Sequence, residues 1–171
     1  MEGSTPDLLV SRHGVMFFRD PQAAFTNLAG LAATHAGLLF SCFRDRAHNP
    51  FFAEVARLLP VPPIPGDPHE PGPFAFADAA RIGAILEAGG WREVKIEPYD
   101  FAMVAGSGDD PVEDAVGYFN RIGPAARALT GLEPDERARF ADRVRALAER
   151  NLRDGIVSLH AAVWIVTGRK A

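Results

Sequence analysis

Residues 7–21 read DLLVSRHGVMFFRDP, a segment that joins a short apolar run to the start of a helix. The run at residues 7–11 predicts a buried strand. Asp20 followed by Pro21 is typical of a helix start, because aspartate caps the first turn and proline fits the first helical position. Apolar residues at helical spacing follow, and a second apolar run covers residues 38–43. Strand, helix and strand with short joints predict a βαβ unit whose two strands are parallel.

The rest of the chain continues this α/β pattern. Residues 60–73 are dense in proline and glycine and predict a surface loop. A helix capped by Asp78 and a strand led by Trp91 follow this loop. The pattern of residues 111–152 is mostly helical, and the apolar run at 156–167 predicts the last strand. We therefore expect a helical insertion before that strand.

The composition indicates a single globular domain over residues 1–171, with 47% hydrophobic residues. The formal net charge of −4 argues against a nucleic-acid-binding protein. No apolar run is long enough for a membrane span, and the first residues lack the basic start and apolar core of a signal peptide. The single cysteine, Cys42, cannot form an internal disulfide. These features predict a cytoplasmic protein without a membrane partner.

Several segments, taken in order, carry a resemblance to one family. They are residues 7–21, 37–40, 74–78, 88–97, 122–126 and 162–167. Together they resemble class I S-adenosylmethionine-dependent methyltransferases, particularly those similar to the ubiquinone/menaquinone-biosynthesis type. The family's sheet has the order 3-2-1-4-5-7-6 with strand 7 antiparallel, and only strands 4, 5, 7 and 6 find a place here. The resemblance thus implies the C-terminal half of a Rossmann-like α/β fold, with helices on both faces.

The resemblance also bears on the cofactor. In the family, a glycine loop after strand 1 and an acid at the end of strand 2 hold S-adenosylmethionine, and neither finds a place before Asp7. We expect the complete family enzyme to use this cofactor and the chain alone not to bind it.

Two functions follow from this resemblance. One is a truncated or split methyltransferase that acts on a small-molecule acceptor. The other is a non-catalytic remnant that serves as an interaction module. In that case the strand at residues 7–12 would be an exposed edge, which another copy or a partner chain would cover.

The loop after the first strand is the candidate site. In the family this loop lies beside the donor methyl group, which implies positions near the reaction for Ser11, Arg12 and His13. Met16 and Phe17 would line the pocket. His13 could act as a general base toward a hydroxyl acceptor, or it could be an ordinary loop histidine.

Other motifs predict no chemistry. The Gly-Ser-Gly at residues 106–108 is interpreted as a plain turn, with a displaced cofactor loop as the alternative. Cys42 is expected to be an inert core thiol. The acidic run around Asp109 predicts a solvated loop, although it could bind a cation, and residues 49–52 could cap a helix or form part of a substrate lid. The remaining histidines have no ligand spacing, so no metal site is expected; they are His35, His48, His69 and His160.

Overall fold

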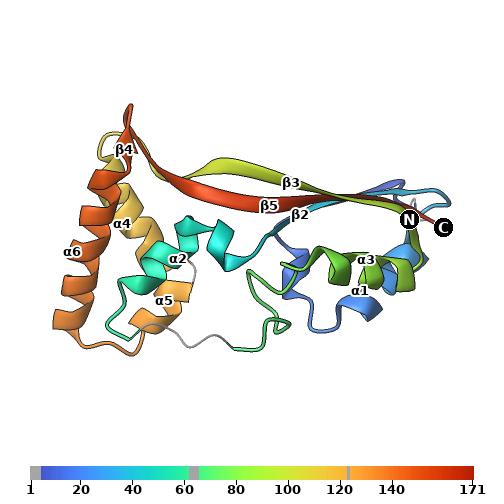
Figure 1. Cartoon of the computed structure of the whole chain (residues 1–171), viewed down its shortest axis with the longest axis horizontal. Coiled ribbons are helices and arrows are strands. Elements are labelled where there is room, and N and C mark those ends of the chain that lie inside the picture. Colours follow the sequence, from blue (N-terminus) through green and yellow to red (C-terminus); the bar gives the residue numbers. More distant parts are fainter. Residues whose placement is uncertain (1–4, 62–65, 123) are drawn as a thin grey trace. The chain divides into compact units, whose positions relative to one another are not determined.

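The computed structural model describes residues 5–61, 66–122 and 124–171 (Figure 1). Its elements are, in order, β1 (Leu8–Arg12), the 3-10 helix η1 (Val15–Phe17), α1 (Pro21–Leu31), β2 (Gly37–Phe43), the 3-10 helix η2 (Arg46–His48), α2 (Pro50–Arg57), α3 (Ala79–Ala88), β3 (Trp91–Gly106), α4 (Pro111–Arg121), α5 (Pro124–Leu129), α6 (Pro134–Arg150), β4 (Leu152–Arg153) and β5 (Ile156–Lys170). None of the helices in these ranges is both long and apolar enough to cross a membrane.

The strands form one mixed sheet of order β1-β2-β5-β3, and the short β4 pairs with β5. β1 and β2 are parallel, with Leu8 beside Gly37 and Arg12 beside Ser41. β5 is antiparallel to β2. The α/β fold class is therefore confirmed, and so is the expected strand order with its antiparallel last strand.

The chain forms two compact units. The first comprises Met1–Asp45, Gly66–Tyr99 and Ala162–Ala171, and the second comprises Arg46–Pro65 and Asp100–Ala161. The strands β3 and β5 each contribute residues to both units. The two units are therefore not separate segments of the chain. The single domain expected over residues 1–171 stays a prediction. Part of the predicted loop at residues 60–73, namely 62–65, lies outside the described residues.

Aspartates define the starts of three helices, as the sequence predicts for two of them. Asp20 accepts a hydrogen bond from the amide of Ala23 at 3.0 Å and caps α1. Asp78 caps α3 in the same way, and Asp110 caps α4. Each carboxylate satisfies an amide that has no partner inside its helix.

Aromatic rings fill the core of the first unit. α1 and α3 lie side by side on one face of its sheet (Figure 1). Phe25 from α1 packs against Phe40 from β2, with ring centroids 5.6 Å apart, and against Phe76. The indole Nε1 of Trp91 donates to the carbonyl oxygen of Phe25 at 3.0 Å. This bond ties the start of β3 to α1 inside the core.

The opposite face of this part of the sheet is open. Leu8, Val10 and Leu39 are 54%, 65% and 38% exposed, and alternation along the strands places them away from α1 and α3. In the first unit, α1 and α3 lie on the other face of the sheet (Figure 1), and these three apolar side chains remain accessible to water.

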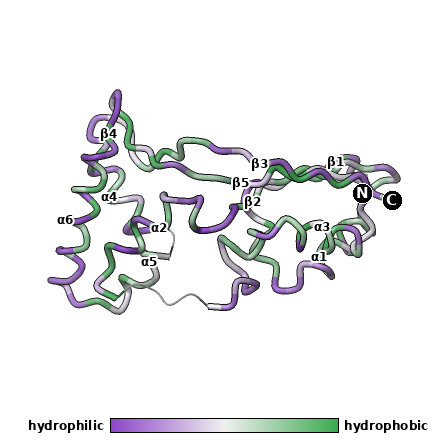
Figure 2. The backbone as a smooth tube through the Cα atoms, in the orientation of Figure 1, coloured by the Kyte–Doolittle hydropathy of each residue, from purple (hydrophilic) through white to green (hydrophobic). Residues whose placement is uncertain are grey.

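The second unit is mainly helical. Hydrophobic and hydrophilic residues alternate along α6 (Figure 2), and its buried side chains Phe140, Val144 and Leu147 recur at helical spacing. They pack in one core with Phe51 from α2 and Phe119 from α4. Residues 111–152 therefore contribute α4, α5 and α6 to this core.

Candidate functional site

The candidate site lies where β1 ends, at the carboxyl edge of two parallel strands. His13 follows β1 directly and has a φ of 55°. Histidine is one of the few residues other than glycine that adopt such left-handed backbone conformations. The amide of His13 donates to the carbonyl oxygen of Ser41 at 3.0 Å, which fixes the loop to β2. A Cβ at the next position, Gly14, would lie 2.9 Å from the Oγ of Ser11, so a side chain at this turn would be crowded.

The His13 ring has two neighbours on β2. Its Nδ1 lies 3.3 Å from the hydroxyl oxygen of Ser41. Its plane stacks on Phe43, with ring centroids 4.5 Å apart and an angle of 10° between the planes. Burial lowers the pKa of His13, and the nearby positive charge of Arg12 lowers it further. The imidazole is therefore neutral at pH 7 and has a nitrogen that can accept a proton.

The other predicted site residues differ in accessibility. Ser11 is half-buried and Arg12 is exposed. Met16 is 1% exposed, whereas Phe17 is 49% exposed. Of the two residues predicted to line a pocket, only Phe17 is accessible to a ligand in this structure. Ser41 and Phe43 were missed by the sequence reasoning, although a serine in the otherwise apolar strand GLLFSCF is a usable signal.

The Gly-Ser-Gly turn packs against α4. A Cβ on Gly106 would lie 1.9 Å from the carbonyl oxygen of Pro111, so the backbone passes too close for a side chain. The amide of Ser107 donates to the carboxylate of Asp114 at 3.0 Å. An anionic ligand would meet an occupied amide and a negative charge. These contacts favour the plain turn over a displaced cofactor loop.

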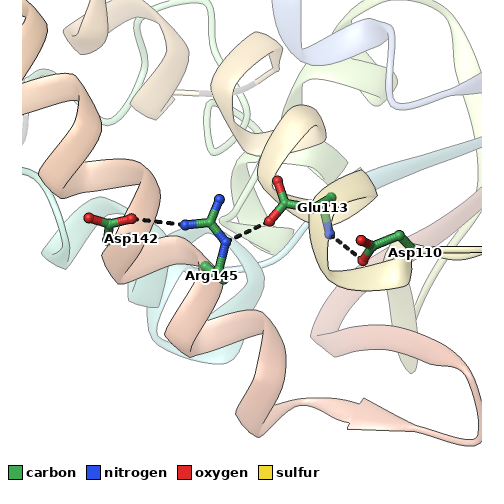
Figure 3. A network of polar contacts seen from close by, with 4 residues as sticks. All are labelled: Asp110, Glu113, Asp142 and Arg145. Carbon is green, nitrogen blue, oxygen red and sulfur yellow. Dashed lines mark hydrogen bonds and ion pairs between the residues drawn. The ribbon is translucent and has the colours of Figure 1, made fainter.

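The acidic residues beside this turn have local partners. Asp110 accepts from the amide of Glu113, and the guanidinium of Arg145 donates to Glu113 at 2.5 Å and to Asp142 at 2.8 Å (Figure 3). These contacts join α4 to α6. Within residues 5–61, 66–122 and 124–171, no group of three His, Cys, Asp or Glu side chains could hold a metal ion. The run therefore has a structural role in the second unit.

Two further candidates are buried. Cys42 is fully buried, and burial raises the pKa of its thiol to about 12. Its Sγ lies 3.7 Å from the carbonyl oxygen of Phe76. In the segment considered as a lid, Asn49 is 0% exposed and Phe51 is 1% exposed. Because Phe51 belongs to the core of the second unit, its movement as part of a lid would open that core.

Comparisons with known proteins found similar solved structures only. No protein-family model and no curated protein matches the chain. A protein of Bacillus halodurans provisionally named a methyltransferase is 12% identical, with a TM-score of 0.49 over 99% of this chain and 73% of that one. The YcgJ protein of Bacillus subtilis is 14% identical, with a TM-score of 0.45 over 96% of this chain and 63% of that one.

A third similar structure is phosphoethanolamine N-methyltransferase 2 of Haemonchus contortus, solved in complex with S-adenosyl-L-methionine. It is 11% identical to this chain, with a TM-score of 0.41. The match covers 96% of this chain and 33% of that one. The chain thus spans between a third and three quarters of the length of these three structures.

Proposed function

We propose that this chain is part of an S-adenosylmethionine-dependent methyltransferase that methylates a small organic acceptor. The strand order β1-β2-β5-β3, with β5 antiparallel to β2, supports this proposal. It is the order 4-5-7-6 that the sequence resemblance implies. Because one fold serves many functions, the proposal also needs a site, and His13 lies at the edge of the sheet where α/β proteins bind their ligands.

The proposal also needs residues that bind the cofactor, and it places them outside this chain. When bound, S-adenosylmethionine provides a methyl group already activated by its sulfonium. The one Gly-x-Gly turn of the sequence does not fit this cofactor, because Asp114 occupies its central amide. We therefore propose that a segment outside residues 1–171 holds the cofactor and packs beside β1, and that the isolated chain does not bind it.

His13 is the residue of this chain that we assign to the reaction. Its imidazole is neutral at pH 7 because burial lowers its pKa, so it can take the proton that a hydroxyl acceptor loses. Positioned bases of this kind contribute about 100- to 10,000-fold to a rate. Ser11, Arg12 and Phe17 are the neighbouring residues that could contact the acceptor.

Calorimetry tests whether a segment outside residues 1–171 is needed to bind the cofactor. The coding sequence on either side of this chain is searched for a strand that ends in a glycine-rich loop, and that segment is co-expressed with the chain. We expect micromolar binding of S-adenosylmethionine by the combined protein and none by the chain alone. Micromolar binding by the chain alone would show that no such segment is needed, and the lack of binding by the combined protein would refute the methyltransferase proposal.

A second function is supported by the exposed edge of the sheet. Among the residues that the structure describes, β1 pairs with β2 only, so it stands at one end of the strand order. Leu8 and Val10 on this strand are more than half exposed. An apolar edge with unpaired backbone groups favours pairing with another chain. The chain could therefore be a non-catalytic interaction module whose β1 binds a second copy or a partner.

Light scattering after gel filtration separates the two cases. Val10→Lys puts a charge at the middle of the edge, and Val61→Lys is the matched control, since Val61 is 77% exposed outside the sheet. If the chain self-associates through β1, Val10→Lys yields monomers and Val61→Lys does not. A monomeric parent protein would exclude self-association and leave the edge to a different partner.

A further inference from the structure

His13 is fixed by contacts that an ordinary surface loop histidine does not need. Its backbone is left-handed, its amide donates a hydrogen bond to the carbonyl oxygen of Ser41, and its ring stacks on Phe43. All three features restrict the ring. Strained residues of this kind concentrate at functional sites, because the surrounding structure must hold them in place. The partner strand β2 supplies two side chains that contact the ring, Ser41 and Phe43.

Ser41 is the polar exception in its strand. The strand reads GLLFSCF, and its neighbours Phe40 and Cys42 are fully buried. A hydroxyl in such a strand is costly unless it is hydrogen-bonded. The His13 Nδ1, at 3.3 Å, is the side-chain partner that the structure gives it. The register explains this meeting, since Arg12 lies beside Ser41 and His13 is the next residue along β1.

The chemistry of imidazole makes the choice of nitrogen important. A neutral ring carries one proton, and the nitrogen without it is the base. If Nδ1 carries the proton and donates to Ser41, Nε2 is left to accept one. If the hydroxyl of Ser41 donates to Nδ1 instead, Nε2 carries the proton and cannot act as a base. The hydrogen bond to Ser41 therefore decides whether His13 is a base or a donor.

We propose that Ser41 is a positioning residue, which accepts a hydrogen bond from Nδ1–H of His13 and leaves Nε2 free to take the proton of a hydroxyl acceptor. The acceptor class rests on the proposed methyl transfer: the acceptor's O–H bond would break and its proton would move to Nε2. The oxygen would form the bond to the methyl group as the methyl's bond to the donor sulfur breaks, and that electron pair would stay on the sulfur as a neutral thioether. Arg12 is the charged neighbour on β1 that acts on the ring, and β2 contributes the uncharged side chains of Ser41 and Phe43 to its surroundings. The positive charge of Arg12 also favours the oxyanion that forms as the proton leaves.

Nitrogen-15 NMR of the full chain tests the assignment without any cofactor. Long-range couplings in the ring distinguish the Nδ1–H form from the Nε2–H form. The protein has five histidines, so His13→Gln identifies the His13 signals by their loss. We expect His13 to be in the Nδ1–H form at pH 7.5. Predominance of the Nε2–H form in the parent protein would overturn the proposal.

Variants then test the role of the hydroxyl. Ser41→Ala should shift His13 from one form to a mixture, whereas Ser41→Thr, which keeps the hydroxyl, should retain the Nδ1–H form. Ser11→Ala is the matched control, because it removes a serine hydroxyl at the same end of the parallel strands, whereas the hydroxyl paired with Nδ1 of His13 is that of Ser41. An unchanged tautomer in folded Ser41→Ala would overturn the positioning role; if that variant does not fold, loss of the Nδ1–H form in Ser41→Thr would overturn it.

The outcome is independent of the methyltransferase proposal. The NMR result can fail while the combined protein binds S-adenosylmethionine, and the binding can fail while His13 has the expected tautomer. Each failure therefore points to one of the two inferences.

Discussion

Replacement of Gly106 by alanine tests whether the Gly-Ser-Gly turn is structural. The new Cβ would lie 1.9 Å from the carbonyl oxygen of Pro111 and 2.7 Å from the amide nitrogen of Ala115. Both obstacles are backbone atoms of α4, so no side-chain rotation relieves the clash. To restore 3.0 Å, the shortest distance that real Cβ atoms show, the helix must move by 3.0 − 1.9 = 1.1 Å relative to the end of β3.

The cost in stability depends on the buried side chains of α4. Ala115 and Phe119 are almost fully buried in the core of the second unit, so a shift of the helix disturbs that packing. Overpacking a core costs about 1–3 kcal/mol, and a backbone obstacle places Gly106→Ala at the upper end, at about 3 kcal/mol. For a chain of this size, each 1 kcal/mol lowers Tm by about 2–4 °C, so we expect a fall of about 6–12 °C.

Far-UV circular dichroism measures this effect in heat and in urea. Gly83→Ala is the matched control, because Gly83 lies inside α3 and a Cβ there meets no atom within 4 Å. Alanine is favoured over glycine in a helix, so this variant should be about 0.5–1 kcal/mol more stable. A free energy of unfolding for Gly106→Ala within about 0.5 kcal/mol of the parent value would refute the reasoning.

Three further predictions concern the first unit. Trp91→Phe removes the indole donor from the buried carbonyl of Phe25 and should lower the free energy of unfolding by about 1–3 kcal/mol in urea titrations; no loss would contradict the bond. Cys42, whose thiol pKa burial raises to about 12, should resist a disulfide reagent at pH 8 and react after urea is added; rapid labelling of the native protein would count against this. The lowered pKa of His13 means that the unfolded chain takes up its proton first, so its contribution to stability is complete above about pH 6.5 and declines as the pH falls through the folded pKa. His13→Gln should remove that decline in unfolding experiments between pH 7.5 and 5, and an identical pH profile for both proteins would disprove it.

The starts of α1 and α3 could be predicted from short sequence motifs, because the capping bonds that fix them join residues close together in the chain. Asp20 and Pro21 mark the start of α1, and the aspartate makes the capping bond that the motif implies. Asp78 does the same for α3. The order of the strands is not local, and it was predicted only through the family resemblance.

Features that depend on strand register were out of reach. His13 and Ser41 are 28 residues apart, and they meet because Arg12 lies opposite Ser41 in the sheet. The boundary between the two units falls inside β3 at Tyr99 and inside β5 at Ala162. Pro98 stands directly before the first of these points, and the chain stays extended through both.

The position of β5 has a consequence for how the protein is made. β5 is the last element of the chain, yet it lies between β2 and β3. While the ribosome is still adding residues 156–170, β3 lacks its neighbour in the sheet and β2 is paired on one side only. Such unfinished edges are prone to aggregation. A stop codon before residue 156 would therefore remove β5 from between β2 and β3, and the sheet can close only after residues 156–170 have been made.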